Sequence, residues 1–166
     1  MTDLDVVVTL LRVVLGITFV AHGYNHGWGA GGLDGTARWF ESIGLRPARL
    51  HAVMSAYMEV AAGTAIVLGL LLPFAAAAGI GVMAVAAVTV HRKNGFFIFK
   101  DGYEYVLVLA TGLIALAILG SGRFSLDNAL GIEFDGLYAG LVAAALGIAG
   151  SGLLLITCWR PSRVSS

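Results

Sequence analysis

The chain is short of charged side chains, which make up 12% of its 166 residues, whereas hydrophobic residues make up 58%. Ordinary soluble domains carry roughly a quarter charged residues. A water-soluble fold of this length would have too little polar surface to cover its exterior. The scarcity of charge therefore excludes a soluble globular protein and favours a lipid bilayer as the solvent, in keeping with a mean hydropathy of +0.89.

Cysteine and basic surface are also scarce. The one cysteine, Cys158, excludes a disulfide or a CxxC redox pair within the chain. The formal net charge is zero and no basic stripe is interleaved with aromatic residues, so we expect no nucleic-acid partner. The sequence lacks HExxH and cysteine–histidine patterns, and no metal site is predicted. Any redox chemistry would need electrons from another molecule.

Long apolar runs, in contrast, are abundant. A membrane-spanning helix needs about 20 mostly apolar residues, and unbroken runs such as Val82–Val90 lack the alternation of membrane strands. We therefore predict an all-α, polytopic membrane helix bundle that forms one domain over residues 1–166. Pro73 marks the break between the second and third spans. The expected spans cover residues 6–24, 50–72, 74–91, 103–119 and 137–159.

Two flanking segments are less regular. Residues 1–5 are acidic where a signal peptide would carry Lys or Arg, so we expect the first apolar segment to be a retained span. Residues 27–35, after it, are rich in glycine. Residues 36–43 fit either a short interfacial helix with Trp39 at the headgroups or an ordered connecting loop, and both alternatives stay open.

The basic residues predict an orientation, because cytoplasmic loops are enriched in Lys and Arg. One side of the expected bundle carries Arg38, Arg46, Arg49, Arg92, Lys93, Lys100, Arg160 and Arg163. The opposite side carries Arg123 among several acidic residues. We expect a bacterial plasma-membrane protein with its N-terminus outside and its C-terminus in the cytoplasm.

Two charges fall deep inside the expected spans. Arg12 lies about 15 Å, and Glu59 about 13 Å, from the cytoplasmic end of its span at 1.5 Å per residue. Because the first two spans are antiparallel neighbours, the similar depths predict an Arg12–Glu59 ion pair. Such a charge in a membrane usually faces a partner or a cavity. The pair could take part in chemistry or only fix the register of the two helices.

Other polar residues gather at the cytoplasmic ends of the spans. The topology brings His22, His26, His51 and His91 to that end, together with Glu104. Histidine carries protons or donates hydrogen bonds to a ligand carbonyl. The cluster fits either a ligand or proton site, or helix ends that cap and hydrogen-bond without chemistry.

Short motifs in this order and spacing resemble the DoxX family of small bacterial membrane proteins, over roughly residues 10–130. The matching positions are Arg12, Gly16, His22-Gly23, Gly44-Leu45, Glu59, Gly63, Gly69, His91, Asn94-Gly95-Phe96, Glu104-Tyr105, Gly120, Gly122 and Ser125-Leu126-Asp127. The resemblance implies a four-helix membrane core, to which residues 137–159 add a fifth membrane helix. Asn25 stands where many relatives would carry a basic residue.

The resemblance also implies a function, since members and relatives of the family are associated with membrane-bound sulfur and thiol redox systems, some related to thiosulfate:quinone oxidoreductase. The first hypothesis is a membrane subunit of a quinone-linked redox system, with His22, His91 and Glu59 contacting the quinone. Catalytic candidates are Arg12, Glu59, His91 and Glu104. A soluble redox partner on the cytoplasmic side would supply electrons, and a homo-oligomer stays open. The alternatives are a non-catalytic anchor or assembly factor and a small transporter or proton pathway.

Overall fold

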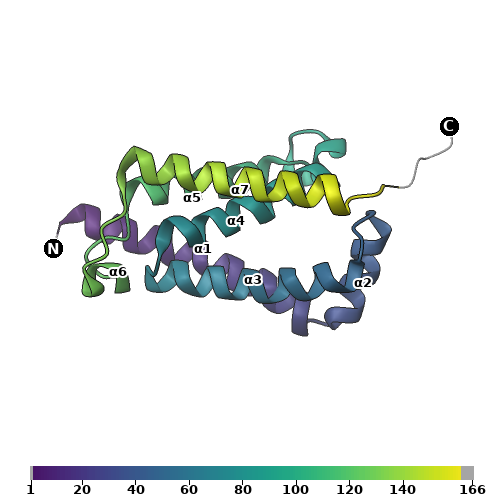
Figure 1. The fold of residues 1–166 in the computed structure, drawn as a ribbon, viewed down its shortest axis with the longest axis horizontal. Helices are drawn as coiled ribbons and strands as arrows, with labels where there is room; N and C mark the ends of the chain where they lie inside the picture. Colours follow the sequence, from purple (N-terminus) through teal and green to yellow (C-terminus); the bar gives the residue numbers. More distant parts are fainter. Residues whose placement is uncertain (1, 162–166) are drawn as a thin grey trace.

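The computed structural model describes residues 2–161, and this part of the chain is helical without strands (Figure 1). Its helices are α1 (Asp3–Trp28), α2 (Gly32–Ser42), α3 (Ala48–Leu68), α4 (Leu72–Ala86), α5 (Glu104–Leu119), α6 (Leu126–Leu130) and α7 (Gly136–Cys158). A π-helical turn, η1 (Ala87–His91), and a 3₁₀ turn, η2 (Arg92–Asn94), extend α4; η3 (Ile98–Lys100) precedes α5. The predicted all-α bundle is confirmed.

Four helical segments are long and apolar enough to cross a bilayer: α1, α3, α4 with its extension, and α7. The remaining predicted span, residues 103–119, is α5, a shorter apolar helix. Two boundaries differ from expectation. Helix α1 continues four residues beyond residue 24, and α3 stops at Leu68 because Gly69 adopts a left-handed conformation (φ +63°) that caps it. Pro73 lies in the first turn of α4, where a missing N–H costs nothing.

Residues 36–43, for which the sequence allowed either a helix or a loop, are helical as far as Ser42, where α2 ends. Helix α2 lies across one end of the bundle, beside α3 (Figure 1). A short backbone bridge between Leu45 and Trp159 ties the end of this segment to the end of α7. The indole N–H of Trp159 also donates to the Ile43 carbonyl at 2.9 Å. The α2 end of the bundle is therefore covered by ordered structure.

Two helix pairs pack through glycines. In the α1–α3 pair, a Cβ added to Gly63 would lie 2.5 Å from the Gly16 carbonyl oxygen. In the α4–α7 pair, a Cβ on Gly147 would lie 2.7 Å from the Ala77 carbonyl oxygen. Small residues let helix backbones approach this closely in membranes. Helix α4 contacts α3, α5 and α7, and so it joins the two pairs.

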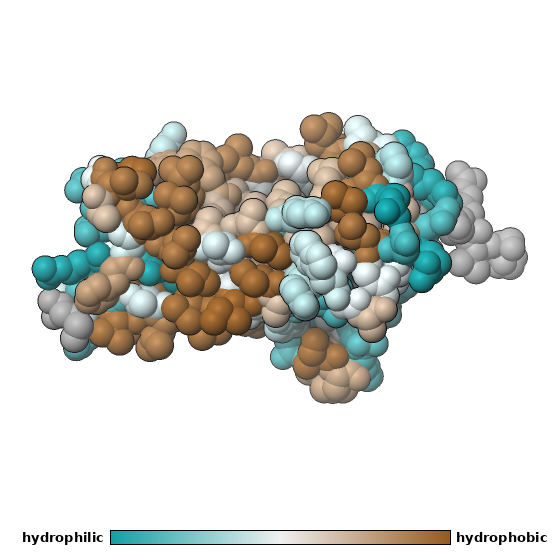
Figure 2. All heavy atoms as spheres, turned by 90° about the horizontal axis from the view of Figure 1, so that it is seen from below, coloured by the Kyte–Doolittle hydropathy of each residue, from teal (hydrophilic) through white to brown (hydrophobic). Residues whose placement is uncertain are grey.

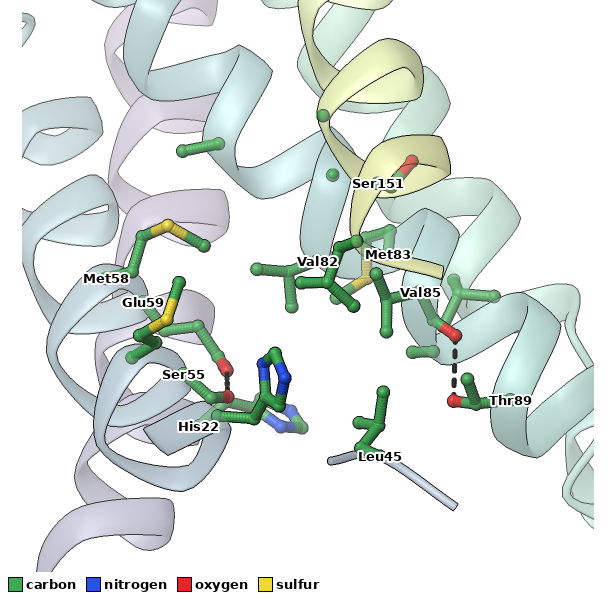
Figure 3. Close-up of a pocket in the computed structure, with 18 of the residues that line it drawn as sticks. His22, Leu45, Ser55, Met58, Glu59, Val82, Met83, Val85, Thr89 and Ser151 are labelled. Atoms are coloured by element: carbon green, nitrogen blue, oxygen red, sulfur yellow. Dashed lines mark hydrogen bonds between the residues drawn. The ribbon is translucent and has the colours of Figure 1, made fainter. Parts of the chain in front are cut away.

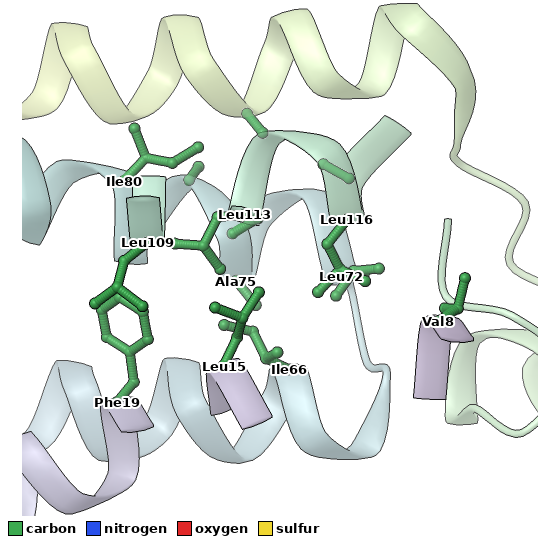
Figure 4. Packing of buried hydrophobic residues seen from close by; sticks show 14 residues of the cluster. Val8, Leu15, Phe19, Ile66, Leu72, Ala75, Ile80, Leu109, Leu113 and Leu116 are labelled. Atoms are coloured by element: carbon green, nitrogen blue, oxygen red, sulfur yellow. The ribbon is translucent and has the colours of Figure 1, made fainter. Parts of the chain in front are cut away.

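Apolar side chains fill the centre and also cover much of the outside. Phe19, Ile66, Leu113 and Leu116 are fully buried where α1, α3, α4 and α5 meet (Figure 4). Many large apolar side chains are exposed, including Leu10 on α1 and Ile156 on α7. Figure 2 shows brown apolar surface over the middle of the visible face and hydrophilic surface towards the two ends. This is the surface of an integral membrane protein.

Candidate ligand cavity

A cavity of about 470 Å³ lies between the α1–α3 pair and the α4–α7 pair, towards the α2 end. Its size is within the range of small-molecule sites in proteins. Most of the lining is apolar, from side chains such as Met58 and Val82 (Figure 3). The polar lining residues are His22, His26, His51, Ser55, Glu59, Thr89, Tyr105 and Ser151. A mostly apolar wall with a few convergent polar groups is typical of a binding site.

The close packing of α1 on α3 places the acidic centre of this cavity. Gly23 lies directly against Glu59, so that a Cβ at position 23 would be 2.9 Å from the Glu59 Cβ. The Glu59 side chain is 2% exposed and accepts a hydrogen bond from the Ser55 hydroxyl, one helical turn earlier. The sequence reveals that pairing through its i, i+4 spacing.

Histidines flank the Glu59 carboxylate. Its Oε1 lies 3.7 Å from Nε2 of His26, whose ring stacks on Trp39 with centroids 5.9 Å apart and planes 11° apart. His22 lines the same wall, and its ring centroid is 6.3 Å from that of Tyr105 on α5. Within residues 2–161, no three His, Cys, Asp or Glu side chains are grouped as metal ligands would be. The cavity therefore joins a buried carboxyl group to imidazole and aromatic side chains.

A π-helical turn shapes the opposite wall. Thr89 and Val90 belong to η1 and line the cavity, and the Thr89 hydroxyl donates to the Val85 carbonyl at 2.8 Å (Figure 3). Turns of this kind are rare and often occur at functional sites. Nothing in the residue pattern of this apolar segment indicates the turn.

The predicted site residues separate into three places. His22 and Glu59 line the cavity, together with His26 and His51. His91 and Glu104 instead order the α4–α5 connection: His91 Nδ1 is 2.8 Å from the Asp101 carbonyl oxygen, and Glu104 accepts from the Ile98 N–H at 2.9 Å. Ser55, Tyr105 and Thr89 join the cavity although sequence reasoning did not name them as site residues.

Arg12 lies at the other end of the bundle, and the predicted Arg12–Glu59 ion pair is wrong. Because α1 extends to Trp28 and α3 begins at Ala48, the antiparallel register places Gly23 beside Glu59 and Arg12 beside Gly69. Positions 12 and 23 are separated by about 16 Å along a helix. The depth estimate failed because it depended on helix ends that the apolar pattern misplaced.

Arg12 belongs to a different buried network. Its guanidinium donates to the carbonyls of Ser121 and Phe124, each at 2.5 Å. The Asp127 carboxylate accepts from the Ser121 hydroxyl at 2.6 Å and from the N–H groups of Leu71 and Leu72 at 2.7 and 3.2 Å. Arg12 and Asp127 are 2% and 3% exposed. They fasten the α5–α6 connection onto α1 and the α3–α4 turn.

Comparisons with known sequences show which family the chain belongs to. The sequence model of the family named DoxX matches residues 7–92. The chain belongs to the DoxX family. It is 32% identical over 122 residues to a Bacillus subtilis (strain 168) protein named "Putative oxidoreductase CatD", an alignment that covers 71% of this chain and 82% of that protein. No solved structure matches the chain. The DoxX match spans α1 to η1 and includes His22, His26 and Glu59.

Proposed function

We propose that this DoxX protein is a quinone-binding membrane subunit of an oxidoreductase system that acts on sulfur compounds or thiols. The observation that carries the proposal is the apolar cavity of about 470 Å³ with the Glu59–His26 contact inside it. The name of CatD supports the redox part of the proposal. The sulfur and thiol part rests on the family resemblance of the sequence.

The residues present fit a quinone. A quinone head is a flat ring with two carbonyl acceptors, and the cavity offers aromatic surfaces at Trp39 and Tyr105 with imidazoles at His22 and His26. Apolar walls suit the ring, and a few polar groups suffice to fix its orientation. His22 stays a candidate contact, whereas His91 lies outside the cavity lining.

Glu59 and His26 are placed to move protons. Reduction of a quinone to a quinol consumes two electrons and two protons. Glu59 would hold a proton at its carboxyl group and exchange it with His26 Nε2, 3.7 Å away, through a bridging water or after a small side-chain movement. His26 is 18% exposed, against 2% for Glu59. Protons would therefore pass between the buried carboxyl group and the α2 end through the imidazole.

Electrons would come from a soluble partner that docks at the basic α2 end, since Cys158 alone cannot form a redox pair. We place the protein in the bacterial plasma membrane with this end in the cytoplasm and the N-terminus outside. A membrane-impermeant maleimide should then label Cys158 in lysed cells and not in intact ones. Labelling of Cys158 in intact cells would show that this end faces outward, which contradicts the proposed orientation.

The test is quinone binding by Glu59→Gln. In protein purified in mild detergent, we expect about tenfold weaker binding of a naphthoquinone or benzoquinone, the effect of losing one hydrogen-bond partner in a buried site. The matched control is Glu104→Gln, because Glu104 accepts a backbone hydrogen bond outside the cavity and Gln can still accept it. Equal binding by all three proteins would overturn the proposed site. Absence of binding by the wild type would overturn the function and favour the anchor or assembly factor.

A further inference from the structure

A second hollow, an open groove of about 290 Å³, lies on the surface between α3 and α4. None of the side chains of its nine lining residues carries a charged group or a hydrogen-bond donor. Most of the lining consists of alanines, and Met58 contributes at one end. The alanines are Ala61, Ala62, Ala65, Ala75 and Ala78.

The groove and the cavity share part of their walls. Met58 and Ala78 line both hollows, one from α3 and one from α4. Met58 directly precedes Glu59, and Figure 3 shows the two side chains on the same side of the cavity. The groove therefore starts where the cavity reaches the outer face between α3 and α4.

The sequence forms the groove by placing small residues on facing stripes of two helices. Ala61 and Ala65 are four residues apart on α3, and Ala75 and Ala78 are three apart on α4, so each pair lies on one helix face. Phe74 and Leu71 close the far end. From Met58 to Ala65 the groove follows α3 for about 10 Å at 1.5 Å per residue.

We propose that this groove binds the long apolar tail of the molecule whose head occupies the cavity. The inference rests on the proposed function and narrows the ligand class to quinones with a long isoprenoid tail. The cavity has the polar groups that a head needs, and the groove has none that could recognise a second polar ligand. Because Met58 and Ala78 border both, one amphipathic molecule fits the two hollows together.

The experiment compares two ligands and three proteins. The ligands are a methylated naphthoquinone without a tail and the same ring with a long isoprenoid tail, titrated into protein in lipid nanodiscs. Quenching of tryptophan fluorescence reports occupancy of the head site, since Trp39 lines the cavity. The proteins are wild type, Ala61→Leu in the groove, and Ala145→Leu, which substitutes another exposed alanine that lines neither hollow.

We expect Ala61→Leu to bind the tailed quinone severalfold more weakly, because its side chain fills part of the groove and removes van der Waals contacts of the tail with α3 and α4. Its affinity for the tailless ring should stay at the wild-type value, and Ala145→Leu should match wild type for both ligands. Equal effects of Ala61→Leu on both ligands would overturn the tail site while the head site stands. If Ala61→Leu lost a co-purifying phospholipid but bound the tailed quinone as wild type does, the groove would hold a lipid chain. That result would also overturn the tail site. Failure of the tailless ring to bind wild type would overturn the proposed function itself.

Discussion

At the scale of single residues, the buried charges divide into two groups with different tasks. Arg12 and Asp127 hold backbone groups together near the α1 N-terminal end, and Glu59 lies in a cavity. The sequence places both Arg12 and Glu59 inside apolar runs, and each residue is 2% exposed in the structure. The sequence could not predict the partners of these two residues. Sliding α3 along α1 by about three helical turns places Gly69 beside Arg12 in place of Glu59.

Asp127→Asn should destabilise the protein. The carboxylate accepts three hydrogen bonds, and its charge lies beside the buried Arg12 network. An amide has one acceptor oxygen, so it leaves donors unpaired and the Arg12 charge without an anion. We expect a loss of about 3 kcal/mol in the free energy of unfolding, as for other broken buried pairs, measured by thermal unfolding in detergent.

The control for this variant is Asp3→Asn, because Asp3 is exposed in the first turn of α1. It should lower stability by less than about 1 kcal/mol, the usual contribution of an exposed charge at a helix end. If Asp127→Asn were as stable as Asp3→Asn, the network would not be what fastens the α5–α6 connection.

At the scale of helices, the hydropathy pattern accounts for most of what the sequence predicts correctly. The five apolar runs correspond to the five apolar helices, and the first two of these helices meet where Gly63 approaches Gly16. Residues 36–43 stayed open because their mixed composition suits both a helix and a loop. The π turn could not be predicted because its apolar residues carry no pattern that marks it, and the cavity could not because its lining comes from helices far apart in the sequence.

Gly63→Ala tests the α1–α3 contact. The added Cβ would lie 2.5 Å from the Gly16 carbonyl oxygen and 2.7 Å from the Val20 nitrogen, both backbone atoms that cannot rotate away. The helices would have to separate, and we expect a loss of about 1–3 kcal/mol in thermal unfolding experiments. Because Glu59 also lies where α3 packs against α1, we expect quinone binding to weaken together with the stability.

Gly152→Ala is the matched control for the helix contact. A Cβ at position 152 of α7 meets no atom within 4 Å. Alanine should therefore stabilise α7 by up to about 1 kcal/mol through its better helix propensity. A Gly63→Ala protein that gains stability as Gly152→Ala does would show that α1 and α3 are not in close backbone contact.

At the scale of the whole molecule, the two ends differ in composition as well as in structure. One end is basic, and α2 lies across it (Figure 1). The other end is acidic and is closed by the Arg12–Asp127 network. The cavity lies towards the basic end, and the groove runs from it along α3 and α4. This polarity is what a membrane subunit needs if protons and electrons arrive at one face and its ligand comes from the lipid.

The most direct measurement of the central claim is the quinone content of protein purified in mild detergent, comparing wild type with Gly150→Leu and Gly152→Leu. Both glycines are on α7 with no atom within 4 Å of an added Cβ, but only Gly150 lines the cavity. Near-stoichiometric quinone in wild type and Gly152→Leu, with a severalfold loss in Gly150→Leu at unchanged thermal stability, is the result we predict. Equal quinone in both variants, or no more in wild type than in an unrelated membrane protein, would contradict a quinone site in this cavity.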